Sequence, residues 1–354
     1  MQAPFQIYCN IQYILLLLGK EKKSMINRIK NILYILAFML TAATGANANT
    51  LLRVNHMTKY ASSVPLLYKI TELLPKYAAA EGINDLKIEY VDVLPATIAN
   101  EMMLAGKIDL IYGGINGFGI LFDKDPNLVR LVAGAEEYDQ WMVCNNLQIK
   151  TLADIKPEHR IAMQGLNSGE HMQLRQYSAA KFGDKEYDKF TSNIIAMPRD
   201  QAVAQLTKDK PEIDCAIVGV PWQNIAVSKG AKVVAHVEDP NKTVGVLNVI
   251  YSTKKWLDEN PKLARAWIAA QKEAIQLWEK NPEHMVKVFM ERDEVTSPTL
   301  EEILQQKKEN KDVYQYKPDS GLKYLDFMYR VGILSGGGKG KTVHDILWDE
   351  SLVK

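Results

Sequence analysis

Two matching apolar segments are each followed by small or aromatic residues whose types suit the binding of a small molecule. The segment LAGKIDLIYGGIN, residues 104–116, ends in Gly113, Gly114 and Asn116. About a hundred residues later, EIDCAIVGVPW, residues 212–222, ends in Trp222. Ligands of parallel α/β sheets bind just beyond the carboxyl ends of the strands. The two segments therefore predict two similar lobes, with a cleft between their strand ends.

Two predicted helices begin directly after strands, at Ser62-Ser63 and at Asn167-Ser168-Gly169. The N-terminus of a helix attracts anions because it carries unpaired N–H groups and a partial positive charge. The alternative is that these side chains only cap their own helices, since Ser and Asn are favoured N-cap residues. We keep both interpretations and expect all five residues near the ligand.

Aromatic and charged side chains next to the predicted strand ends complete the set of expected ligand-binding residues. Tyr60, Tyr138 and Trp222 would supply apolar walls, although buried packing is the default for an aromatic residue. Arg199 would pair with an anionic group of the ligand, with a solvated surface position as the alternative. Glu136 would repel a simple anion and suits a zwitterion or an amine, unless it lies on a solvated crossing segment.

The sequence contains no arrangement that predicts catalysis. No nucleophile–base pair, metal-ligand spacing or paired carboxylate stands out, so we expect no catalytic residue, no metal and no cofactor. The glycine run 336–340 lacks the Ser or Thr and the preceding strand of a phosphate-binding loop. The 43 basic and 42 acidic residues give no sign of a nucleic-acid partner.

Residues 25–48 are typical of a secretory signal peptide. A short basic start, an apolar stretch over 31–40 and the site Ala46-Asn47-Ala48 follow one another, and the apolar stretch is shorter than the roughly 20 residues of a membrane span. We expect a periplasmic protein cleaved near Ala48, with Met25 rather than Met1 as the start. Cys144 and Cys215 then remain; export permits a disulfide, but we favour buried free thiols.

Strands and helices alternate in the predicted order of a parallel sheet covered by helices. The expected strands span 51–54, 86–91, 108–112, 128–133, 142–144, 160–163, 194–196, 213–218, 232–235 and 246–251. The expected helices span 62–80, 96–104, 118–122, 169–181, 201–206, 256–278, 301–308 and 321–331, with a restart at Pro282. We interpret 136–141 as a crossing into a second lobe and 246–251 as the return crossing.

The order of these motifs resembles that of periplasmic substrate-binding proteins of the nitrate/sulfonate/taurine class of ABC importers, which includes relatives similar to thiamine-pyrimidine-binding proteins. The resemblance covers the chain from about residue 50 onward. It rests on the A-x-A leader, LAGKIDLIYGG followed by NLVRLVAG, LADIKPEHRIAMQGLNSGEHMQLRQY, GVPW and WLDENPKLARAWIAAQKEAI.

The resemblance implies a type II periplasmic binding protein fold, in which two α/β lobes joined by two crossing segments close on a ligand. After a leader at 1–48, lobe 1 would comprise 49–141 and 245–354, and lobe 2 would comprise 142–244. The expected function is delivery of a small anionic or zwitterionic ligand by a monomer to an ABC permease in the inner membrane. The alternatives are binding of a thiamine pyrimidine or aromatic ligand, ligand sensing, and an enzyme on the same fold. The pyrimidine-synthesising relatives carry a cysteine-rich motif that this chain lacks.

Overall fold

The structure, a computed structural model, describes residues 50–56, 63–92, 96–137, 139–237, 248–294, 299–309, 314–318 and 321–349. The predicted leader at 1–48 lies outside this part of the chain, and so do Tyr60, Ser62 and Tyr138. Ser63 is described as the first residue of a helix, but its side chain is not. Among the described residues, no helix is both long enough and apolar enough to cross a membrane.

The first set of strands follows the alternation that the sequence predicts. β1 (Leu51–His56) pairs in parallel with β2 (Lys87–Asp92). In a second group, β10 (Asn248–Thr253) lies between β3 (Ile111–Gly114) and β4 (Val129–Glu136) and is antiparallel to both. A parallel bridge from Val54 to Leu110 joins β1 to the start of β3. The helices of this region are α2 (Ser63–Ala80), α3 (Ala96–Leu104) and α4 (Ile115–Lys124).

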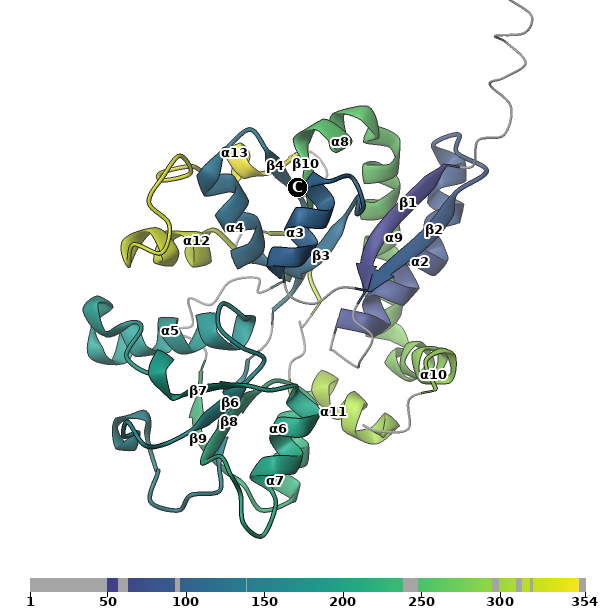
Figure 1. Cartoon of the computed structure of the whole chain (residues 1–354). Helices are drawn as coiled ribbons and strands as arrows, with labels where there is room; N and C mark the ends of the chain where they lie inside the picture. Colours follow the sequence, from purple (N-terminus) through teal and green to yellow (C-terminus); the bar gives the residue numbers. More distant parts are fainter. Residues whose placement is uncertain are drawn as a thin grey trace, which may run out of the picture. The chain divides into compact units, whose positions relative to one another are not determined.

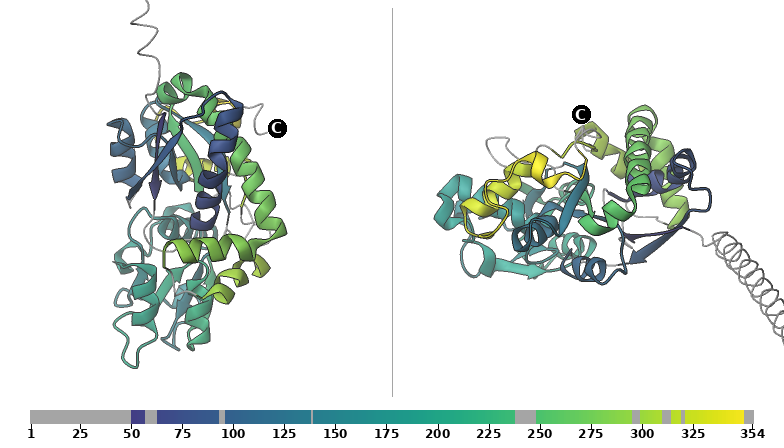
Figure 2. Two further views of the ribbon diagram at one scale, coloured as in Figure 1. Left: turned by 90° about the vertical axis from the view of Figure 1, so that its right-hand side faces the viewer. Right: turned by 90° about the horizontal axis from the view of Figure 1, so that it is seen from above.

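The second set of strands forms one sheet in the order β7-β6-β8-β5-β9. Its strands are β5 (Trp141–Cys144), β6 (Ile161–Met163), β7 (Ile194–Ala196), β8 (Cys215–Val218) and β9 (Lys232–His236). β6 is parallel to β7 and β8, whereas β5 is antiparallel to β8 and β9. Its main helices are α5 (Gly169–Phe182), α6 (Arg199–Leu206) and α7 (Trp222–Ser228). In Figures 1 and 2 the second set of elements is drawn in teal to green, whereas the first set combines purple and blue elements with the green β10.

The expectation of purely parallel sheets is therefore wrong at β5 and β10. β5 follows the predicted crossing segment, and β10 is the predicted return crossing, so each enters a sheet whose other strands come from elsewhere in the sequence. A strand that arrives by a crossing runs opposite to its neighbours in this structure, and hydrophobic periodicity carries no information about strand direction.

The same hydrogen-bond pattern occurs in both sets of strands. It involves Asp109 and Asp214, the aspartates of the two matching sequence segments 104–116 and 212–222. In the first sheet the main-chain N–H of Arg53 donates to the Asp109 carboxylate at 2.7 Å, and the N–H groups of Asp109 and Leu110 donate to the Arg53 carbonyl at 2.8 and 3.2 Å. In the second sheet the main-chain N–H of Arg160 donates to the Asp214 carboxylate at 2.8 Å. The N–H groups of Asp214 and Cys215 donate to the Arg160 carbonyl at 3.0 and 3.1 Å. The predicted internal repeat is thus confirmed down to its hydrogen bonds.

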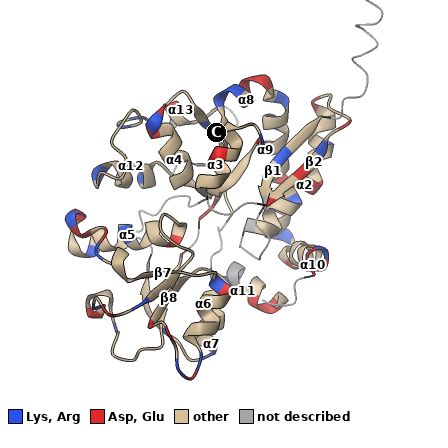
Figure 3. Cartoon of the chain, in the orientation of Figure 1, with Lys and Arg blue, Asp and Glu red and all other residues tan. Residues whose placement is uncertain are grey.

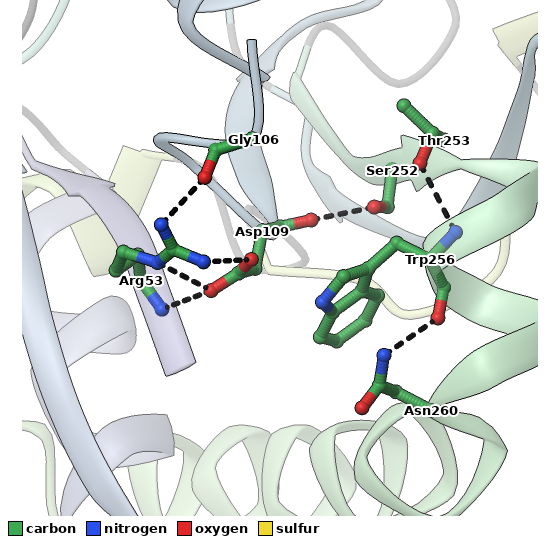
Figure 4. A network of polar contacts seen from close by, with 7 residues as sticks. All are labelled: Arg53, Gly106, Asp109, Ser252, Thr253, Trp256 and Asn260. Carbon is green, nitrogen blue, oxygen red and sulfur yellow. Dashed lines mark hydrogen bonds and ion pairs between the residues drawn. The ribbon is translucent and has the colours of Figure 1, made fainter. Parts of the chain in front are cut away.

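Among the described residues, Asp109 makes more hydrogen bonds than Asp214, the corresponding residue of the second sheet. The guanidinium of Arg53 adds two bonds to the carboxylate at 3.1 and 3.0 Å, and the Ser252 hydroxyl donates to the Asp109 carbonyl at 2.5 Å (Figure 4). Ser252 belongs to β10, so Asp109 ties together strands from three distant parts of the sequence. Asp109 is 4% exposed, which makes these bonds hard for water to replace.

The remaining helices pack on the strands or helices of the first set, or on one another. The long helix predicted over 256–278 is divided, because Asn260 leaves the helical conformation and Pro261 starts a new helix. The helices α8 (Lys254–Glu259) and α10 (Pro282–Arg292) each carry both basic and acidic residues (Figure 3), in keeping with the balanced charge. These helices are α8 (Lys254–Glu259), α9 (Pro261–Lys280), α10 (Pro282–Arg292), α11 (Leu300–Glu309), α12 (Gly321–Arg330) and α13 (Val343–Ile346).

The apolar core follows the two sets of strands. One cluster unites buried residues of 52–135 and 249–347, including the fully enclosed Trp267 and Trp278. Two smaller clusters lie on the second sheet, where Met142 and Cys144 belong to one cluster and Val143 to the other. This alternation follows from the period-2 geometry of a strand. Met172 and Ala179 of α5 pack into the first cluster, so that helix contacts elements from both parts.

Cys144 and Cys215 form a disulfide, so our expectation of free thiols is wrong. The two residues face each other across the antiparallel pair β5–β8, with Cα atoms 4.0 Å apart. The spacing of 71 residues in the sequence carries no sign of this register. A disulfide between buried cysteines is typical of proteins from oxidising compartments.

We expect Asp109→Ala to lower the free energy of unfolding by about 2–3 kcal/mol, because the partly buried donors of Arg53 lose a charged, buried acceptor. Asp214→Ala should cost less, about 1 kcal/mol, since its described donors are neutral. Urea denaturation measures both losses, and the exposed Glu283→Ala serves as a control with an unchanged midpoint. A wild-type midpoint for Asp109→Ala would contradict the role given to this residue.

Candidate functional site

The carboxyl ends of the first sheet bring three polar positions into one row. Gly114 of β3 pairs with Asn248 of β10, and Asn248 pairs in turn with Glu136 of β4. The Asn248 side-chain amide donates to the Glu136 carboxylate at 2.6 Å. Glu136 is completely buried rather than solvated. The structure therefore places Glu136 at the same edge as the predicted glycine pair, with Asn248 between them.

Asn116 connects this row to the second set of elements. Gly114 is the N-cap of α4 and makes no side-chain cap bond, so the helix starts immediately after the strand. Asn116, in its first turn, is 4% exposed and donates from Nδ2 to the main-chain oxygen of Asn167 at 2.5 Å. Two predicted site residues from different parts of the sequence are thus in direct contact.

The segment Asn167-Ser168-Gly169 forms the start of α5 as predicted. Asn167 has a positive φ of 61°, a conformation that asparagine tolerates better than most residues. Its side-chain oxygen accepts from Arg175 at 3.0 Å. Ser168 caps the helix by accepting from the N–H of His171 at 3.3 Å. The capping interpretation thus applies to Ser168, whereas Asn167 presents its carbonyl to Asn116.

His171 is a residue that the sequence reasoning missed. It is 1% exposed; its Nδ1 accepts from the Asn167 N–H at 3.0 Å, and its Nε2 lies 3.0 Å from the Thr191 hydroxyl. Burial, aided by the nearby charge of Arg175, lowers the pKa of His171 to about 4. The ring is therefore neutral near pH 7 and holds Asn167 in its unusual conformation. A signal was present, because His171 stands three residues after the N-cap Ser168.

Arg199 starts α6, as its place in the sequence suggests, but it is not an open cation. Its Nε and Nη2 lie 2.7 and 2.5 Å from one carboxylate oxygen of Glu170. Glu170 is completely buried and the Arg199 side chain is 13% exposed. Arg199 is therefore not a solvated surface residue, and its contact with the ligand stays a prediction. Sequence reasoning missed Glu170, because an acid in the first turn of a helix is ordinary.

Trp222 begins α7 directly after the turn that follows β8. It is half-buried and packs with Trp141 against the cluster on one face of the second sheet. α5 follows β6, α6 follows β7 and α7 follows β8, and these strands are parallel neighbours. The helix starts that carry Glu170, Arg199 and Trp222 therefore lie along one edge of the sheet.

Two other polar features of the chain lie outside this group of residues. A polar surface depression of about 340 Å³ lies at the opposite end of β8, where Asn145, Glu158, Arg160 and Asp214 line it. The glycine run 336–340 has an internal partner, since the N–H groups of Ser335 and Gly336 donate to the Asp123 carboxylate at 3.2 and 2.7 Å. Among the residues that the structure describes, no group of three His, Cys, Asp or Glu side chains could hold a metal ion.

We expect the wild-type chain to lose stability as pH falls from about 6.5 towards 4. In the unfolded chain His171 binds a proton near pH 6.5, whereas in the folded chain its pKa is lowered to about 4. A fall in pH over this range therefore stabilises the unfolded state relative to the folded state. The slope should be about 1 kcal/mol per pH unit. Urea unfolding of wild type and His171→Gln between pH 5 and 6.5 measures it. Equal slopes for both chains would show that His171 does not cause the effect.

We expect Asn116→Ala to weaken the binding of a solute by about 10-fold, because it removes the hydrogen bond to Asn167. The matched control is Asn146→Ala, which removes an amide bonded to Asp214 at 2.9 Å, far from this edge. Titration calorimetry should show loss of affinity for the first variant only. If both variants lose stability but bind the solute as tightly as the wild-type chain, Asn116 has a structural role and no role in binding.

The comparisons with known proteins agree with this architecture. Residues 115–289 match the model of the NMT1-like family. A search of curated proteins finds no match. Many solved structures are similar, and three of them illustrate the likeness.

The chain is similar to the periplasmic aliphatic sulphonate-binding protein SsuA of Escherichia coli, with 18% identity, TM-score 0.60 and coverage of 86% of this chain and 99% of the other. It is similar to the alkanesulfonate-binding protein SsuA of Xanthomonas axonopodis pv. citri, bound to MOPS, with 16% identity, TM-score 0.65 and coverage of 86% and 99%. The periplasmic nitrate-binding protein NrtA of Synechocystis PCC 6803 gives 17% identity, TM-score 0.62 and coverage of 84% and 85%. The predicted resemblance is therefore confirmed: the chain has the periplasmic binding protein fold, and its residues 115–289 match the model of the NMT1-like family.

Proposed function

We propose that this chain is the extracytoplasmic solute-binding component of an ABC importer. It closes two lobes on a small anionic or zwitterionic solute and delivers the solute to a permease. In this proposal lobe 1 comprises 49–141 and 245–354, and lobe 2 comprises 142–244. The chain acts as a monomer and as a binder rather than an enzyme.

The observation that carries the proposal is the contact between Asn116 and Asn167. Each residue follows a strand at the carboxyl edge of its own sheet, where ligands of α/β proteins bind. A hydrogen bond between these two edges supports a site to which both lobes contribute. Proteins that close by hinge motion bind their ligands at such a place.

The disulfide supports the proposed location. Cys144 and Cys215 are cross-linked in the structure, and disulfides persist in oxidising compartments such as the periplasm. The predicted signal peptide at 25–48 gives the same location from an independent part of the sequence. The compact unit Leu51–Lys354 begins just after the predicted cleavage site at Ala48.

A thermal-shift panel on the processed chain tests the proposal. The probes are nitrate, sulfate, taurine, alkanesulfonates, aromatic carboxylates, thiamine pyrimidines and amino acids. A solute at a hundred times its dissociation constant adds about 2.7 kcal/mol, which raises the melting temperature by roughly 5 °C. We expect one chemical class to give this shift and to be recovered unchanged.

Native mass spectrometry of the purified chain completes the test. A co-purified small molecule would explain a panel without shifts and would identify the solute directly. A flat panel together with a ligand-free mass would contradict the proposed binding function. Chemical conversion of a bound probe would favour the alternative of an enzyme on this fold.

A further inference from the structure

Glu170 is a buried acid whose bonding within the chain is incomplete. It is the second residue of α5 and is completely buried. One carboxylate oxygen, Oε1, accepts both bonds from Arg199. The other, Oε2, is also enclosed and has no hydrogen-bond partner among the described residues. A buried carboxylate oxygen without a donor costs free energy, so a donor from outside the described chain would stabilise it.

The pairing of Arg199 with Glu170 makes this edge a poor receptor for a bare oxyanion. Two guanidinium nitrogens of Arg199 already bond to the carboxylate, so its positive charge is matched. The carboxylate of Glu170 also lies in the first turn of α5, where the helix dipole would otherwise favour an anionic ligand. The negative charge of Glu170 would therefore repel an anionic ligand at this helix start.

Two buried amides at the same edge offer both donors and acceptors. Gln140 is completely buried and Gln223 is 1% exposed, and neither side-chain amide has a hydrogen-bond partner in the described part of the chain. Gln140 directly precedes Trp141, which pairs with Val218 at the carboxyl end of β8. Gln223 lies in the first turn of α7, just beyond that same end. Both amides therefore belong to the edge at which α5 begins.

We propose that the solute presents an N–H group to Oε2 of Glu170. This inference rests on the proposed binding function and narrows its ligand class. The solutes that fit carry an N–H donor next to an acceptor, as aminosulfonates and amino-substituted heteroaromatic rings do. Nitrate, sulfate and alkanesulfonates without an amine or hydroxyl group lack the donor that Oε2 requires. Gln140 and Gln223 then bond to the acceptor and donor groups that remain on the solute.

Matched pairs of probes test the proposal by titration calorimetry on the purified chain. Taurine and propane-1-sulfonate share a sulfonate and differ in an amine against a methyl; 4-amino-2-methylpyrimidine and 2,4-dimethylpyrimidine also differ in an amine against a methyl. We expect the amine member of at least one pair to bind about 10-fold or more tightly than its partner. Glu170→Gln should weaken that probe by about 10- to 100-fold, because the new NH₂ group replaces the acceptor.

Two further variants separate binding from folding. Glu186→Gln changes an exposed acid shortly after α5 and should leave every affinity unchanged. The double variant Glu170→Gln/Arg199→Gln removes both charges of this ion pair together, so it should fold and still lose the amine probe. Circular dichroism and the melting temperature of each ligand-free variant verify that the chain is folded.

The outcomes distinguish this inference from the proposed function. Binding of propane-1-sulfonate or nitrate as tightly as the amine probes, or an unchanged affinity of Glu170→Gln, would overturn the inference and leave the binding function intact. A co-purified solute without an N–H group, identified by native mass spectrometry, would do the same. A chain that binds no probe and carries no solute would contradict both proposals.

Discussion

One hydrogen-bond pattern around an aspartate determines how both sheets of this protein are assembled. The carboxylate of Asp109 accepts the main-chain N–H of Arg53, and that of Asp214 accepts the main-chain N–H of Arg160. In each case the main-chain N–H groups of the aspartate and of the next residue donate hydrogen bonds to the arginine carbonyl. The strand after each aspartate is thereby fixed beside its parallel neighbour. A single residue of slippage would break all of these bonds.

Because these aspartates fix the register of the strands, they also determine which residues lie at the carboxyl edges of the sheets. β3 ends in Gly113 and Gly114, and β8 is followed by Gly219 and the start of α7. The crossing strands add amides at matching places, since Asn248 pairs with Gly114, and Gln140 precedes the residue that pairs with Val218. Two copies of one supersecondary unit thus present amides and buried acids to the proposed site.

Much of this arrangement was predictable, because its elements carry strong local signals. The helix Ala96–Leu104 has the bounds that its periodicity predicts, and both I-D strands are present. Periodicity locates elements well but says nothing about which strands pair or in which direction. The antiparallel crossing strands β5 and β10, and the disulfide between Cys144 and Cys215, depend on such pairing.

The candidate site was predictable only in part, for a related reason. Asn116, Asn167 and Glu136 stand next to strand ends in the sequence, and the structure places them at sheet edges. Glu170 and His171 have the ordinary residue types of a first helical turn. Their importance comes from burial and from partners such as Arg199 and Thr191. Such partners become visible only when distant segments are placed together.

A crystal structure of the chain with its co-purified or titrated solute tests the central claim most directly. The account predicts that the solute contacts residues of both sheet edges, with Asn116 and Glu136 on one side and the start of α5 on the other. Electron density for the solute in the depression lined by Asn145, Glu158 and Asp214, with none at those edges, would contradict it.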